Sequence, residues 1–154
     1  QGYSSAASDV YKRQIQEIDA NEYMEILPKE YINYTLETNK NYNKYDDMVL
    51  DCEDKLWQEN RSNKKKYGTD FKIVYEVQSE VLYKDDKDLS ELTEKYNNKY
   101  DSTAKIEEAA KATVITEVKA ADAVGNSTIS EMCFIKIDGT WYLDIDNITN
   151  LLAE

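Results

Sequence analysis

The side chains that most enzymes use for acid–base and metal chemistry are scarce in this chain of 154 residues. Histidine, whose charge changes near neutral pH and which is the commonest metal ligand, is absent. The four glycines are scattered and form no phosphate-binding loop or dinucleotide fingerprint. Cys52 and Cys133 match no metal-ligand or redox spacing. We interpret them as buried free thiols, and a disulfide between them stays open.

Two short acidic clusters are the remaining candidates for a metal site. One lies at residues 85–88 and the other at residues 144–147. Neither contains the central glycine and the terminal glutamate of a calcium-binding loop. We therefore predict no metal and no cofactor, and we interpret these carboxylates as helix caps and solubilising charges.

The overall charge excludes some classes of partner. Thirty-one acidic residues against nineteen basic ones give a formal charge of −12, which repels phosphate backbones and anionic lipid surfaces. No segment has the roughly 18 to 20 consecutive apolar residues of a membrane-spanning helix. We therefore expect no nucleic-acid binding and no direct membrane insertion.

The first residues look foreign to the domain. Residues 4–14 read Ser-Ser-Ala-Ala-Ser-Asp-Val-Tyr-Lys-Arg-Gln, which permits the coding sequence of a transposase adapter used in preparing sequencing libraries. We interpret residues 1–14 as adapter-derived and disordered or non-native, and residues 15–154 as one domain. On this interpretation the natural chain begins before Ile15, and its start is missing together with any signal peptide or lipid-anchoring cysteine.

The elements that would position any site begin with helices. Residues 25–39 read as a helix with Pro28 in its first turn, where the missing N–H costs nothing. Residues 45–67 have apolar positions at helical spacing, acidic residues near the start, lysines near the end and Gly68 as a stop. A shorter helix is predicted from Asp88, as N-cap, to Tyr100.

The rest of the chain has the two-residue period of strands. Residues 71–84 alternate apolar and polar side chains, which predicts a long strand with one covered face. Further strands are predicted at 110–120, 127–137 and 140–145, the last two joined by an Asp-Gly hairpin turn. The predicted fold class is α+β, with N-terminal helices packed on a curved antiparallel four-stranded sheet.

This arrangement and two short segments carry a family resemblance. The closing hairpin Ile-Asp-Gly-Thr-Trp-Tyr-Leu-Asp at residues 137–144, after a helical first half and long strands, resembles the nuclear transport factor 2-like, cystatin-like superfamily. Leu-Pro-Lys-Glu-Tyr-Ile at residues 27–32 resembles uncharacterised lipoprotein domains of Gram-positive gut bacteria. The resemblance implies a cone-shaped fold and an extracytoplasmic setting, and it supplies no catalytic residue.

In that superfamily the cone often encloses a pocket, where some members use Asp or Tyr for proton transfer. The pocket candidates here are Tyr75, Tyr83, Trp141, Phe71 and Met132, and the carboxylates considered for proton transfer are Glu117 and Asp144. Alternation puts Asp144 on the face opposite Trp141, and it turns Glu117 away from its apolar neighbours. We therefore expect both carboxylates to be solvated, and we predict no catalytic residue.

Two function hypotheses follow. The first is a non-catalytic extracytoplasmic binding or spacer domain of a bacterial surface lipoprotein, with a small molecule or protein as ligand. The alternative is a small-molecule isomerase or dehydratase with a Tyr/Asp pocket in the cone. A cone filled by Phe71, Met132 and Trp141 would favour the first, and a deep cavity with a buried carboxylate near Tyr75 or Tyr83 the second. A homodimer through the open sheet face is a further expectation.

Overall fold

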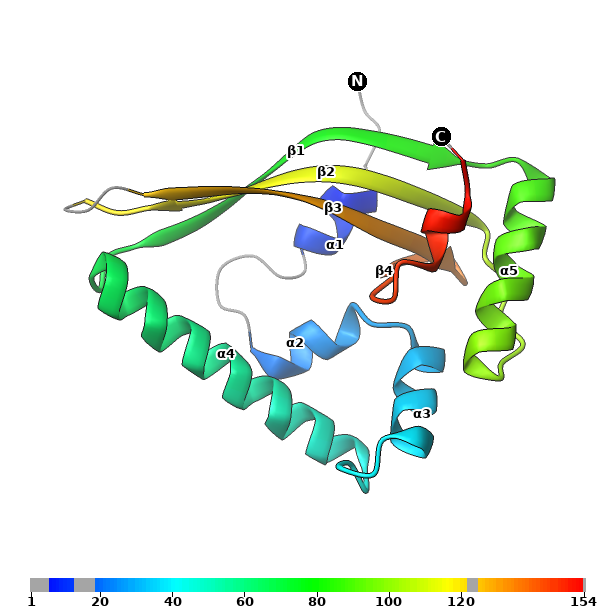
Figure 1. Ribbon diagram of the computed structural model, residues 1–154, viewed down its shortest axis with the longest axis horizontal. Helices are drawn as coiled ribbons and strands as arrows, with labels where there is room; N and C mark the ends of the chain where they lie inside the picture. Colours follow the sequence, from blue (N-terminus) through cyan, green and yellow to red (C-terminus); the bar gives the residue numbers. More distant parts are fainter. Residues whose placement is uncertain (1–5, 13–18, 122–124, 154) are drawn as a thin grey trace.

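The computed structural model describes residues 6–12, 19–121 and 125–153. Helices precede and interrupt an antiparallel four-stranded sheet, as the α+β prediction requires (Figure 1). The elements in chain order are α1 (Ala6–Lys12), α2 (Ala20–Glu25), α3 (Lys29–Thr38), α4 (Tyr45–Tyr67), β1 (Lys72–Tyr83), α5 (Asp86–Tyr100), β2 (Glu108–Lys119), β3 (Asn126–Ile137), β4 (Thr140–Leu143) and the 3-10 helix η1 (Ile148–Leu151).

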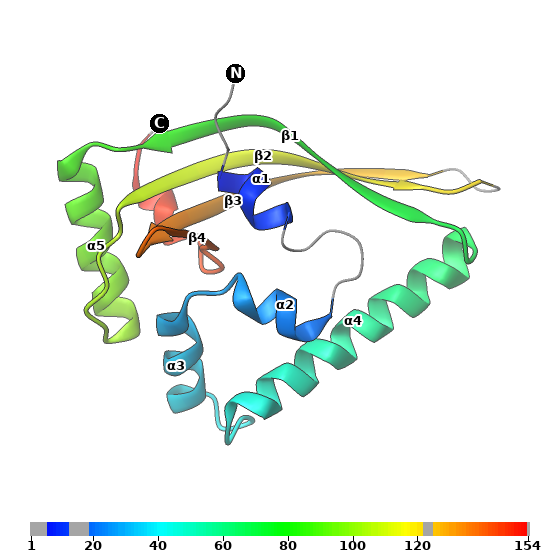
Figure 2. The same cartoon turned by 180° about the vertical axis from the view of Figure 1, so that it is seen from behind.

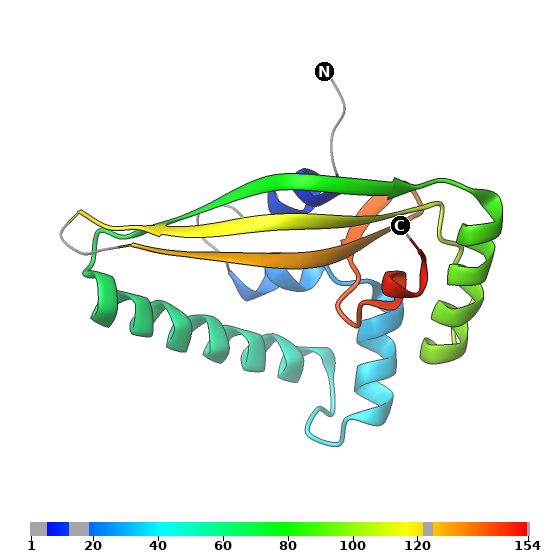
Figure 3. The ribbon, with the colours of Figure 1, turned by 45° about the horizontal axis from the view of Figure 1, so that its top comes forward.

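The sheet has the strand order β1-β2-β3-β4, with every neighbouring pair antiparallel. Three long strands run side by side along the molecule, and the short β4 lies at the far edge (Figure 3). Asp138 and Gly139 join β3 to β4 with φ angles of 50° and 77°. Two consecutive left-handed residues make the tight hairpin turn that matches the strand twist, which confirms the predicted Asp-Gly turn.

A β-bulge changes which side chains of β1 face the core. The pairing with β2 shifts between Val77 and Ser79. Before the shift Tyr75 lies on the face that packs against α1 and α2, whereas after it Tyr83 lies on the opposite face. The prediction of one continuous covered face over residues 71–84 is therefore wrong in its second half, because the inserted residue reverses the alternation.

Two hydrophobic clusters cover the two faces of the sheet. The larger one joins Phe134, Trp141 and Leu143 of the sheet to α1, α2 and the chain around Leu27. The other joins Ile135 of the sheet to α5 and the C-terminal segment. Figure 2 shows α1 and α2 beneath the strands and α5 across one end. The end of the sheet near α5 is consequently buried on both sides.

The helical first half is divided where the sequence predicted one helix. Residues 25–39 contain the end of α2, a turn with buried Ile26 and Leu27, and α3 starting at Lys29. Pro28 is the N-cap of α3 rather than part of its first turn, because its ψ of 142° is extended and not helical. Helix α4 spans Tyr45–Tyr67, as predicted, and Gly68 follows it with φ 86°.

Helix α1 lies within the segment interpreted as adapter-derived. Its Ala6, Ala7 and Val10 side chains are buried against the sheet. The backbone N–H of Ala7 donates to Oε1 of Glu80 at 3.1 Å. Burial raises the pKa of the Glu80 carboxyl, and the bonds from α1 oppose this. The adapter interpretation stays a prediction, and in the structure residues 6–12 are helical and packed.

Candidate functional site

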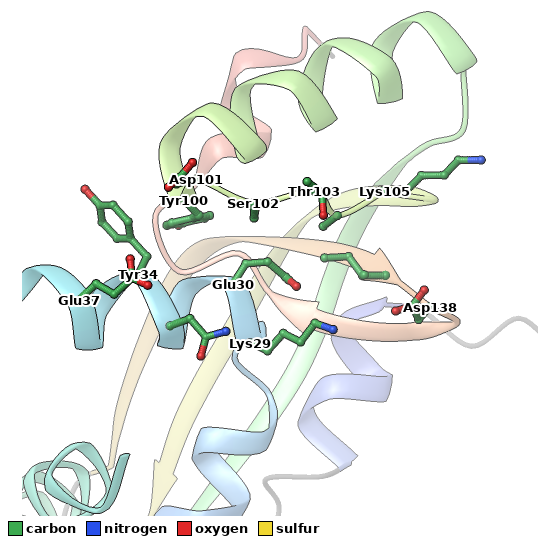
Figure 4. Close-up of a pocket in the computed structure, with 13 residues that line it drawn as sticks. Lys29, Glu30, Tyr34, Glu37, Tyr100, Asp101, Ser102, Thr103, Lys105 and Asp138 are labelled. Carbon is green, nitrogen blue, oxygen red and sulfur yellow. The ribbon is translucent and has the colours of Figure 1, made fainter. Parts of the chain in front are cut away.

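A polar cleft of about 450 Å³ opens between α3, the loop after α5 and the β3–β4 turn (Figure 4). Its lining residues come from three segments that are far apart in the sequence. They are Lys29, Glu30, Asn33, Tyr34, Glu37, Tyr100, Asp101, Ser102, Thr103, Ala104, Lys105, Ile137 and Asp138.

The buried carboxylate of Glu30 lies at the base of this cleft. Glu30 is in the first turn of α3, where the helix dipole favours a negative charge, and it is only 8% exposed. The hydroxyl of Tyr96 in α5 donates to its Oε1 at 3.0 Å. Burial, followed by the nearby Glu30 charge, raises the pKa of the Tyr96 phenol. Tyr96 is therefore a neutral hydrogen-bond donor at physiological pH.

The second oxygen of the Glu30 carboxylate, Oε2, differs from the first in its contacts. Among the described residues, Oε2 has no hydrogen-bond partner, and it is not one of the unpartnered atoms sealed from solvent. The Glu30 side chain lines the cleft (Figure 4). A carboxylate oxygen in a recessed, partly desolvated position binds hydroxyl or ammonium donors more strongly than a surface carboxylate does.

A cluster of tyrosines holds α3 against α5 beside the cleft. The rings of Tyr31, Tyr34 and Tyr96 lie edge-on to Tyr100, with centroid distances of 6.0, 5.6 and 4.9 Å. The Tyr100 hydroxyl donates to Oδ2 of Asp146 at 2.5 Å. Burial and this bond raise the pKa of the Tyr100 phenol. Tyr34 and Tyr100 of the cluster line one wall of the cleft, and the Tyr100 phenol is neutral.

The opposite wall is the loop after α5. Asp101 ends the helix in the left-handed conformation, with φ 50°. The Asn97 amide then accepts from Ala104 N at 2.9 Å and from Ser102 Oγ at 2.8 Å, and it donates to Ala104 O at 2.8 Å. A loop held by three side-chain bonds is preorganised for binding.

The charged side chains around the cleft are mostly acidic. The carboxylates lining it are Glu30, Glu37, Asp101 and Asp138, and the lysines are Lys29 and Lys105. An excess of acid disfavours anions and suits neutral polyols or amines. Ser102 and Thr103 add hydroxyls that can exchange hydrogen bonds with such ligands.

Asp144 is a second buried carboxylate, and it lies outside this cleft. It is 2% exposed, and its Oδ2 accepts from both N and Oγ1 of Thr149 at 2.7 Å. Its Oδ1 is buried without a hydrogen-bond partner in the described part of the chain. Burial raises the pKa of the Asp144 carboxyl, and the Thr149 bonds oppose this. The carboxylate closes the turn that leads into η1.

The expected solvation of Asp144 is therefore wrong. Strand β4 ends at Leu143, and Asp144 N donates to Cys133 O at 2.9 Å. The face opposite Trp141 is covered by α5 and the C-terminal segment, so alternation in the strand could not reveal burial there. Glu117, by contrast, is exposed, as the alternation predicted.

The sequence-derived pocket candidates do not form one site. Tyr75 and Tyr83 are eight residues apart on β1, about 26 Å along a strand, and lie on opposite faces. Tyr75, Met132 and Trp141 pack into or against the larger cluster. Phe71 is half-buried just before β1. None of these residues lines the cleft around Glu30.

Tyr83 and Cys133 lie near a second cleft, of about 520 Å³, on the other side of the sheet. Cys133 lines it, but burial raises the pKa of this thiol to about 12. Both cysteines are free thiols, and Cys133 is protonated at neutral pH, which excludes a thiolate nucleophile. Lys111, which lines this cleft, donates from Nζ to Leu152 O at 2.6 Å. Its ammonium group is therefore bonded to the C-terminal segment.

Sequence reasoning missed the cleft because no motif marks it. Glu30 was read only as part of a helix, and Asn97 gave no signal of its role in the loop. The sequence offered one signal, an acidic residue directly after the Pro-Lys start of a helix. Acidic residues are common in the first turn of any helix, so this signal does not mark a site.

No protein-family model, curated protein or solved structure matches the chain. The superfamily resemblance therefore stays an expectation. Within the described ranges no helix is long and apolar enough to cross a bilayer. No group of three or more acidic or cysteine side chains in those ranges is arranged to hold a metal ion.

Proposed function

We propose that this chain is a non-catalytic binding domain whose cleft beside Glu30 takes a small polar ligand with hydroxyl or ammonium donors. One observation carries the proposal: the buried Glu30 carboxylate, with one oxygen bonded to Tyr96, lines an acidic cleft. Trp141 and Phe134 pack into the apolar cluster on the inner face of the sheet. This packing supports a filled cone rather than a reaction pocket.

The setting we propose is extracytoplasmic, as part of a bacterial surface lipoprotein. The resemblance of residues 27–32 and 137–144 to such domains and the strongly acidic surface support it. Recovering the upstream coding sequence tests the setting. A signal sequence with a lipid-anchoring cysteine is expected, and a start codon just before Ile15 would contradict it.

Titration with monosaccharides, small polyols and primary amines, followed by calorimetry, tests the binding proposal. Glu30→Gln keeps an acceptor oxygen but removes the charge, so we expect affinity for an amine to fall at least about tenfold. Glu25→Gln, an exposed carboxylate at the end of α2, is the matched control and should leave binding unchanged. Equal affinity in Glu30→Gln, or no binding by any class, would contradict the proposal.

One observation favours an isomerase or dehydratase as a second candidate. Asp144 has a raised pKa and an unpartnered buried oxygen, and its charge is felt by the phenols of Tyr96 and Tyr100. A buried carboxylic acid near tyrosine phenols is an arrangement that some enzymes use for proton transfer. Turnover of a carbonyl or hydroxy-acid substrate that is lost in Asp144→Asn would favour this candidate over the binding domain.

A further inference from the structure

Helix α4 exposes large apolar side chains on its outer side. Leu50 is 62% exposed and Trp57 58% exposed, and the seven-residue spacing puts them on one face. The helix runs along the edge of the molecule, with α2 on its inner side (Figure 1). Leu50 and Trp57 give this helix face an exposed apolar centre that a partner could cover.

Charged residues continue this face in both directions. We call the set the α4 stripe; its residues, at steps of three or four, are Asp46, Leu50, Glu53, Trp57, Arg61 and Lys64. The stripe is acidic toward the start of the helix and basic toward its end. Its four charged side chains form no ion pair within the described residues, although the Arg61 guanidinium lies 5.3 Å from the centre of the Trp57 ring.

A stripe with this polarity is complementary to itself when reversed. Two antiparallel copies centred between Glu53 and Trp57 would place Asp46 opposite Lys64. Each Trp57 would lie opposite the partner's Glu53, about one helical turn from the partner's Trp57. The helix is about 34 Å long at 1.5 Å per residue, so both charged ends can meet. A parallel pair would oppose like charges. We propose that α4 is a homodimerisation surface, occupied by α4 of a second copy of this chain in antiparallel orientation.

The charge of the whole chain sets the strength expected of this dimer. Two copies at −12 each repel over most of their surfaces, and the stripe is a local exception. A contact along one helix face belongs to the small class of interfaces. The dimer therefore dissociates on dilution.

Sedimentation velocity of the full chain over a dilution series tests the surface. The wild type should shift from monomer to dimer as concentration rises, and Trp57→Glu should weaken association at least about tenfold. Ile129→Glu is the matched control, because Ile129 is 66% exposed on the open sheet face and should leave association unchanged. A monomer at every concentration, or a dimer lost in Ile129→Glu and kept in Trp57→Glu, would overturn the proposal.

Charge reversal tests the pairing itself. One variant carries Asp46→Lys with Glu53→Lys, and the other carries Arg61→Glu with Lys64→Glu. Each variant alone makes its stripe one sign and should be monomeric. An equimolar mixture should restore the dimer, because opposite stripes then meet, and this recovery shows that both variants are folded. Dimers in either variant alone, or no dimer in the mixture while circular dichroism shows both folded, would overturn the proposal.

Discussion

The phenol of Tyr96 and the carboxylate of Glu30 connect α5 to α3 at the base of the cleft. Both groups are buried, so neither can exchange its partner for bulk water without cost. The Tyr42 hydroxyl makes a similar bond to Asp51 at 2.6 Å, near the surface. The two pairs have the same chemistry and differ in burial, which makes them a matched comparison.

We expect Tyr96→Phe to lower the free energy of unfolding by about 1–3 kcal/mol, because it leaves a buried acceptor without its donor. Tyr42→Phe should cost about 1 kcal/mol or less, since water can replace the lost hydroxyl. Urea denaturation measures both. Equal losses in the two variants would show that burial of the Glu30 pair contributes nothing.

The raised pKa of Asp144 predicts a dependence of stability on pH. Between the unfolded carboxyl pKa of about 3.9 and the higher folded value, the native state keeps a proton that the unfolded state releases. Stability therefore falls as pH rises through that window. Asp144→Asn, which still offers an acceptor oxygen to Thr149, removes this effect.

We accordingly expect the free energy of unfolding of Asp144→Asn, relative to that of the wild type, to rise as pH increases from about 3.9. The total rise should be about 1.4 kcal/mol for each unit by which folding raises the Asp144 pKa. Thr149→Val removes a bond that opposes the shift, so in the wild-type background the loss should extend to higher pH and become larger. Denaturation at several pH values measures this. A difference between Asp144→Asn and wild type that is constant with pH would contradict it.

At the scale of elements, the β3–β4 turn holds one side of the cleft. Gly139 has φ 77°, and a Cβ built on it would meet no atom within 4 Å. We expect Gly139→Ala to cost about 1 kcal/mol from backbone strain alone. Thermal unfolding measures it, and Thr140→Ala is a control at the first residue of β4, where no left-handed backbone is needed. An unchanged melting temperature in Gly139→Ala would contradict the strained turn.

Elements with a strong local period were predictable, and tertiary details were not. The 3.6-residue pattern and charged ends of residues 45–67 gave α4 its bounds. The bulge after Val77 has no glycine to mark it, so the reversed face of Tyr83 could not be read from alternation. The N-cap of α5 is Asp85 rather than Asp88, because its carboxylate reaches the N–H groups of Lys87 and Asp88 at 3.0 and 3.1 Å.

The candidate site was less predictable than the fold. Its walls come from α3, the loop after α5 and the β3–β4 turn, which meet only after folding. Burial of Glu30 depends on α5 packing across the end of the sheet, a contact between residues 66 positions apart. Sequence alternation tests only neighbours in one strand or helix and cannot detect such a contact.

In the whole molecule, α1 covers part of the inner face of the sheet. Deleting residues 1–14 would expose the apolar surface under Ala6, Ala7 and Val10 and leave Glu80 without its N–H donor. We expect a loss of about 2–3 kcal/mol from the uncovered side chains. Chemical denaturation of the shortened and full chains measures it. An unchanged free energy of unfolding would instead support the interpretation of residues 1–14 as extraneous to the domain.

The cleft beside Glu30, and not the inner face of the sheet, is where we propose that ligands bind. Soaking crystals with small polyols and amines, and locating the bound fragments, tests it most directly. We expect fragments within hydrogen-bond distance of Glu30 Oε2 and in contact with Ser102 or Thr103. Fragments gathered instead against Trp141 and Phe134 on the inner sheet face would contradict it.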